Sequence, residues 1–151
     1  MVRLPKFVHT IYCDDVRFEV GGKTTFVGTF RDLNIQGLLP VVIPKICVVV
    51  TLQLPADHDI DRAIIKMTKD DVIIQEMVIP QEMIDQQKAK TDANPGANYH
   101  VFGAIITLQN YQLDASCVLR VQVDIGEEAD LMASGLKVNL VPEEPQLELS
   151  V

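Results

Sequence analysis

The sequence lacks the features by which membrane and secreted proteins are recognised. No apolar run approaches the roughly 18 residues of a membrane span, and the stretch MVRLPKFVHT has no apolar segment like that of a signal peptide. Cysteine is scarce: Cys13, Cys47 and Cys117 are widely spaced, and no CxxC pair exists. Because all three lie in apolar runs, we expect free thiols in a cytoplasmic protein, with a Cys47–Cys117 bridge between facing sheets as the alternative.

Positive charge is also in short supply. The 13 Lys and Arg residues face 21 Asp and Glu residues, which gives a formal net charge of −8. The basic residues are scattered, and their densest group is Lys88 with Lys90. An acidic surface repels phosphate backbones and anionic lipid, so we expect neither nucleic acid nor a membrane as a partner.

Motifs for catalysis are missing as well. No GxSxG is present, and the serines have no histidine or other base nearby in the sequence. The GGK at residues 21–23 lacks the spaced glycines and the Ser or Thr of a phosphate loop. The three histidines show no metal-ligand spacing. We therefore expect a protein that is not an enzyme and needs no cofactor.

What the sequence does contain is a strand pattern over most of its length. Runs rich in Val, Ile, Thr and Phe are separated by turn residues, and the 151 residues suffice for one domain, residues 1–151. The pattern predicts an all-β, single-domain antiparallel β-sandwich, C2-like or immunoglobulin-like, with one short helix in a long connection. The expected strands are Lys6–Tyr12, Val16–Val20, Thr24–Phe30, Lys45–Leu54, Arg62–Thr68, Val72–Ile79, Tyr99–Leu108, Cys117–Ile125 and Ser134–Leu140, with Leu33–Leu38 as a weaker tenth.

Three segments depart from this pattern. In the long connection, residues 80–98, the run IPQEMIDQQKAK predicts a helix that begins near Pro80. The segment LLPVVIPK carries Pro40 and Pro44, which favours a crossing or edge segment over a central strand. The tail, residues 142–151, is either flexible or an edge strand, because residues 146–151 alternate and contain no glycine or proline. Such a tail could pair with a partner's sheet, so we expect a homodimer.

The stretch CDDVRFEVGGKTTFVGTF, residues 13–30, predicts a β-hairpin. We expect Val16, Phe18 and Val20 to face the core, and a bulge or kink where the alternation slips at Asp14–Asp15. A three-residue loop, residues 21–23, would set Phe18 opposite an aromatic partner, Phe26. The charged string is then hairpin exterior, and its candidate interaction residues are Asp14, Asp15, Arg17 and Glu19.

These residues also carry a resemblance. The opening CDDVRxExGGKxxxxGxF, the later PKICVVV and the run GxxxxLxNYxL are similar to a family of small bacterial and phage-encoded proteins of unknown function. The similarity is strongest over residues 13–54 and weaker over residues 102–141. It implies a bacterial or prophage origin and a β-sandwich, and it implies no activity.

A second candidate site is the acidic loop at residues 57–61. Asp57, Asp59 and Asp61 alternate in DHDID just after a strand, and loop carboxylates so spaced can ligate Ca²⁺. The EF-hand pattern fails, because its glycine position is Arg62 and its acidic twelfth position is Thr68. The sequence therefore favours a non-enzymatic protein-interaction module with a protein partner or a homo-oligomer, and the alternative is a calcium- or small-ligand-binding sandwich.

Overall fold

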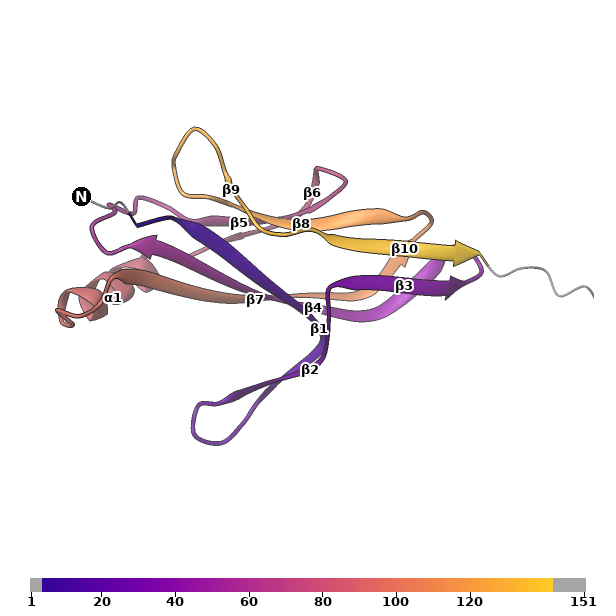
Figure 1. The fold of residues 1–151 in the computed structure, drawn as a ribbon, viewed down its shortest axis with the longest axis horizontal. Coiled ribbons are helices and arrows are strands. Elements are labelled where there is room, and N and C mark those ends of the chain that lie inside the picture. The colour runs from indigo at the N-terminus through magenta and orange to yellow at the C-terminus, as the bar shows by residue number, and fades with distance from the viewer. Residues whose placement is uncertain (1–3, 143–151) are drawn as a thin grey trace, which may run out of the picture.

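The computed structural model describes residues 4–142, which form two β-sheets packed face to face with one helix at one end (Figure 1). The predicted all-β sandwich with a single short helix in a long connection is confirmed for this part of the chain. Among the same residues, no helix is long and apolar enough to cross a membrane.

The first sheet is antiparallel, with strand order β2–β1–β4–β7. β4 is central: it pairs with β1 on one side and, along its whole length, with β7 on the other. The strands of this sheet are β1 (Phe7–Phe18), β2 (Thr24–Phe30), β4 (Val41–Pro55) and β7 (Tyr99–Leu113).

The second sheet has the order β3–β10–β8–β5–β6 and is mixed. Its β3 and β10 run parallel, while the remaining neighbours are antiparallel. A short strand that the sequence pattern did not predict, β9, also pairs with β8. The strands are β3 (Asp32–Gly37), β5 (Ile64–Lys69), β6 (Val72–Val78), β8 (Cys117–Asp124), β9 (Leu131–Met132) and β10 (Leu136–Pro142).

The core lies between the sheets and follows from the alternation of their strands. On β8, Leu119, Val121 and Val123 are fully buried, while the residues between them are partly exposed. Their counterparts in the first sheet include Val48 and Leu52 of β4. Since successive side chains of a strand point to opposite faces, this strict pattern identifies the buried face from sequence alone.

The first two predicted strands form one continuous strand, β1. The predicted kink at Asp14–Asp15 corresponds to a left-handed residue on the partner strand, Gly28, with a φ of +66°. The pairing register is the same before and after this point, so no residue is inserted as a bulge. Beyond it, the end of β1 and the start of β2 leave the sandwich as a projecting hairpin (Figure 1).

The segment LLPVVIPK has the edge character that its prolines predict, although Val41–Pro44 also begins β4, which is central over the rest of its length. It pairs with β7 there, and β1 reaches β4 only as far as Cys47. Among residues 4–142, one side of this end of β4 therefore has no ladder partner, which is why a proline, with no N–H to donate, is accommodated.

The predicted helix is confirmed as α1 (Gln81–Asp92), with Glu82 in its first turn and Lys90 in its last. Only Ile84 and Thr91 are buried, and the helix packs against β7. The expectation for the tail, residues 142–151, lies outside the described residues except for Pro142, where β10 ends.

Candidate interaction surface

The distal part of the β1–β2 hairpin, residues 14–28, is called the hairpin arm below. Its loop consists of Val20, Gly21 and Gly22, because the N–H of Glu19 donates to the carbonyl of Lys23 at 2.7 Å. Both glycines have positive φ, +84° and +75°, which other residues rarely adopt. The predicted loop length of three residues is thus confirmed, but the loop begins one residue earlier than expected.

This shift changes which side chains meet across the arm. Phe18 lies opposite Thr24, and Val16 lies opposite Phe26, so the predicted Phe18–Phe26 pair is wrong. Val16, Phe18 and Phe26 still share one face, since residues directly opposite each other point to the same side of a sheet.

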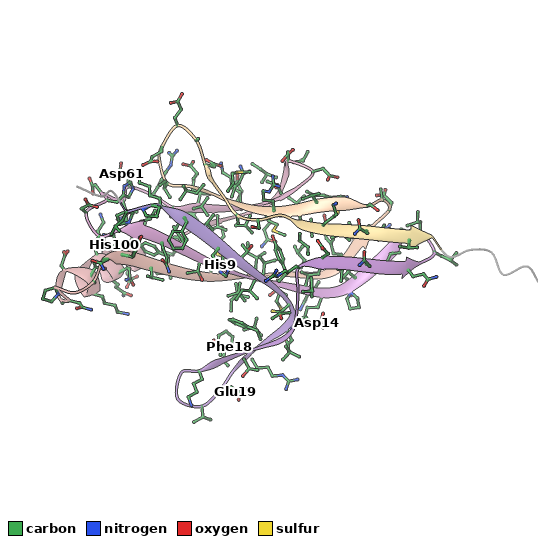
Figure 2. The ribbon with its side chains drawn as sticks, viewed as in Figure 1. His9, Asp14, Phe18, Glu19, Asp61 and His100 are labelled. Atoms are coloured by element: carbon green, nitrogen blue, oxygen red, sulfur yellow. The ribbon has the colours of Figure 1, made fainter. Side chains whose placement is uncertain are left out.

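The expectation that Val16, Phe18 and Val20 face the core is also wrong. Phe18 is 76% exposed and Val20 is 97% exposed. The reason is the bend at Asp14 and Gly28, beyond which the arm projects away from the sandwich, with Phe18 and Glu19 far from the core (Figure 2). The apolar face of the arm, formed by Val16, Phe18 and Phe26 with Val20 at the tip, is an exposed surface that sequence reasoning missed.

Two of the predicted interaction residues take part in a charge network at the base of the arm. Lys45 of β4 donates from Nζ to Oδ1 of Asp15 at 2.6 Å, and Arg17 Nε lies 3.7 Å from Oδ2 of the same carboxylate. The hydrogen bond from Lys45 lowers the pKa of Asp15 and raises that of Lys45. All three side chains remain at least one-third exposed, so the network is a solvated one.

The other two predicted residues are not part of that network. Asp14 is exposed, and its carboxylate lies against the backbone of Gly28. Glu19 is exposed next to the loop, which its backbone N–H closes. The four charged residues therefore lie along one arm but do not converge on a single point.

The acidic loop does not form a ligand cluster in the part of the chain that the structure describes. No group of three or more His, Cys, Asp or Glu side chains there is arranged to hold a metal ion. Asp57 and Asp59 line a shallow hollow of about 230 Å³ that Asp61 does not reach. Asp59 lies 3.6 Å from the ammonium of Lys88, so a cation already faces this carboxylate.

The cysteines are buried and form no disulfide, which confirms the predicted free thiols and excludes the Cys47–Cys117 bridge. Cys13 and Cys47 lie opposite each other on β1 and β4. Burial raises the pKa of Cys13 and of Cys117. A nucleophilic cysteine needs a lowered pKa, so Cys13 and Cys117 are poorly suited to catalysis.

A cleft of about 760 Å³, which the strand pattern does not indicate, runs beside β1. Five consecutive residues of β1, from Val8 to Tyr12, form one wall, and Ser134 with Gly135 lies across from them. Tyr12 donates from its hydroxyl to the carbonyl of Ser134 at 3.2 Å, and burial raises the pKa of this tyrosine. Arg31 and Asp32 complete the rim where the chain passes from β2 to β3.

Comparison with known proteins places these features in a family. A family model described as "Family of unknown function (DUF6941)" matches residues 9–137. No curated protein matches the sequence. The matched range contains the hairpin arm and every residue that lines the cleft except Val8, and it ends in β10.

Proposed function

The chain belongs to DUF6941, a family of unknown function, and we propose that it is a non-enzymatic protein-interaction module that docks through the apolar face of the hairpin arm. The observation that carries this proposal is the 76% exposure of Phe18 on a hairpin that projects from the sandwich. Burying a phenylalanine side chain stabilises a fold by about 1.5–3 kcal/mol. Phe18 does not gain this stabilisation in the isolated fold, and a partner that buries its side chain would provide it.

The arrangement of charge around the arm supports a protein as the occupant. The apolar tip, Phe18 and Val20, is bordered at its base by Asp15, Arg17 and Lys45. An apolar anchor surrounded by polar groups is the usual anatomy of a protein–protein contact. A narrow two-stranded arm fits an apolar pocket on the partner. A lipid surface is disfavoured, because the net charge of −8 repels anionic membranes.

The test places a photo-crosslinking amino acid at position 18 in one preparation and at position 132 in another. Met132 is the control, since it is also exposed but lies on β9 in the second sheet. The protein captured from position 18 alone is then purified, and its affinity for the wild-type chain is measured by calorimetry.

We expect Phe18→Ser to weaken that binary affinity at least about tenfold, because aromatic anchors dominate such contacts. Val78→Ser, which removes an exposed apolar side chain from β6, should leave it unchanged. Equal capture from both positions, or a purified partner that binds Phe18→Ser as tightly as wild type, would contradict the proposal. Binding to neutral lipid vesicles that Phe18→Ser abolishes would replace the protein partner with a membrane.

The origin of the protein in a bacterium or a phage, which the sequence resemblance implies, stays a prediction.

A further inference from the structure

One edge of β1 has no strand partner in the described part of the chain over the first part of its length. β2 pairs with β1 only from Tyr12 to Phe18, because the chain leaves the first sheet at Arg31 and enters β3 in the second. Residues 7–11 of β1 pair with β4 on one side and, among residues 4–142, with no strand on the other. Their outward N–H and C=O groups are therefore available to an added strand.

The cleft of about 760 Å³ runs along this open edge. Its wall of consecutive β1 residues matches a strand of five residues, about 17 Å long. Thr10 lines the cleft, and its hydroxyl oxygen is buried on the same face of β1 as Tyr12. Polar residues such as His9, Arg31 and Ser134 also line the cleft.

We propose that this edge accepts residues 146–151 of a second copy of the chain as an added strand. These residues read QLELSV, in which Leu147, Leu149 and Val151 share one face in an extended chain. The open stretch of β1 alternates in the same way, with buried Val8 on the core side and exposed His9 on the other. A strand added here would continue the burial pattern of the first sheet.

Charge favours this edge over β6, one of the two edge strands of the second sheet. Residues 143–151 carry three glutamates and no basic residue. β6 carries Glu76 and follows the acidic turn Asp70–Asp71, which would repel them. The cleft beside β1 is lined by His9, Arg31 and a single acid, Asp32, and Arg31 makes no ion pair with a described residue.

The short connection after β10 indicates that the added strand comes from a second copy. Lys137 pairs with Asp32 at the cleft, and β10 then runs five more residues to Pro142, about 17 Å away. If residues 146–151 form the added strand, the four Cα–Cα steps from Pro142 to Gln146 span at most about 14 Å. The chain's own tail therefore falls short of its own cleft. Reciprocal exchange of tails between two copies gives a closed dimer.

The experiment combines light scattering, hydrogen exchange and a peptide. We expect the full chain to be dimeric at tens of micromolar and a chain ending at residue 145 to be monomeric. Amides of residues 8–11 should exchange slowly in the full chain and rapidly in the shortened one, while β6 amides exchange alike in both. The full-length variant Leu147→Lys/Leu149→Lys should also be monomeric, with rapid exchange at residues 8–11. This variant shows that the dimer is lost without shortening the chain.

A labelled peptide of residues 143–151 should bind the shortened chain, and the same peptide with both lysines should bind at least about tenfold more weakly, a difference of about 1.4 kcal/mol. A full chain that is monomeric would show that the two copies do not swap tails, even if the amides of residues 8–11 exchanged slowly with solvent. Protection of β6 in place of residues 8–11 would overturn the choice of edge. Because the hairpin arm takes no part, Phe18→Ser should leave the dimer intact, so this inference and the proposed function fail separately.

Discussion

The carboxylate of Asp14 lies across the backbone of Gly28, in the space where any other residue at position 28 would carry its Cβ. Gly28 has a φ of +66° and sits between two regular pairs, Cys13 with Thr29 and Asp15 with Val27. The two residues therefore mark the bend at which the hairpin arm separates from the sandwich. The exposure of the arm depends on a local backbone conformation that glycine adopts readily.

Gly28→Ala should destabilise the protein by about 1–2 kcal/mol, because an alanine in the left-handed region is strained. Gly103→Ala is the matched control: Gly103 also lies in a strand, has no positive φ, and has open space around its missing Cβ. The free energy of unfolding from chemical denaturation measures both. Equal stability of the two variants would mean that the bend does not constrain residue 28.

Phe18→Ser should change the free energy of unfolding by no more than about 0.5 kcal/mol, because an exposed side chain away from the core contributes little to stability. Phe102→Ala, at a residue only 4% exposed, should cost about 3–5 kcal/mol. Thermal and chemical unfolding of the two variants compare them directly. A large loss in Phe18→Ser would show that the arm packs against the sandwich in solution.

The ion pair between Asp15 and Lys45 should make stability depend on pH at the acidic end. The hydrogen bond from Lys45 lowers the pKa of Asp15, so its stabilisation is present above the unfolded-state pKa of about 3.9. It is lost as the pH falls through the lowered folded-state pKa. Asp15→Asn should thus have a lower free energy of unfolding than wild type at neutral pH. This difference between the two proteins should disappear on acidification.

Lys45→Gln serves as the partner variant for this experiment. The difference in free energy of unfolding between Lys45→Gln and wild type should also disappear on acidification. The double variant should be no less stable than the less stable of the two single variants. A gap between wild type and Asp15→Asn that stays constant from neutral pH down to pH of about 2 would contradict the role given to the Asp15 carboxylate.

Calcium should leave the melting temperature unchanged. Asp57, Asp59 and Asp61 do not converge, and only a ligand that binds the native state raises its stability. The measurement is a thermal scan with and without millimolar Ca²⁺. A rise of several degrees that disappears in Asp59→Asn would establish the calcium-binding alternative instead.

The sequence predicted those parts of the fold that depend on local alternation. β8 is the clearest case, since its apolar residues alternate strictly and its burial follows them. The helix α1, within the connection of residues 80–98, is predicted from proline and charge placement, which act within a single turn. The parallel pairing of β3 with β10 is not predicted from the sequence. Periodicity shows which face of a strand is buried, but it does not identify the neighbouring strand.

The same limit explains why the candidate surfaces were missed. Val16 and Phe18 alternate like core residues, and only the bend at Gly28 places them outside the sandwich. The loop was misplaced by one residue because Gly21 and Gly22 can occupy the first two or the last two positions of a three-residue loop. The open edge of β1 exists because β2 departs at Phe30, which is a property of the topology.

The parallel ladder between β3 and β10 also bears on how the protein folds. Asn34 pairs with Asn139, so closing the second sheet joins segments that are separated by most of the chain. Contacts of such sequence separation slow folding, since chain entropy must be lost before they form. During synthesis, β3 has no partner until residues 137–142 have left the ribosome, and the apolar side chains of Leu33 and Ile35 lack their final packing until then. β10, the last strand within residues 4–142, is therefore the one that provides β3 with its ladder partner.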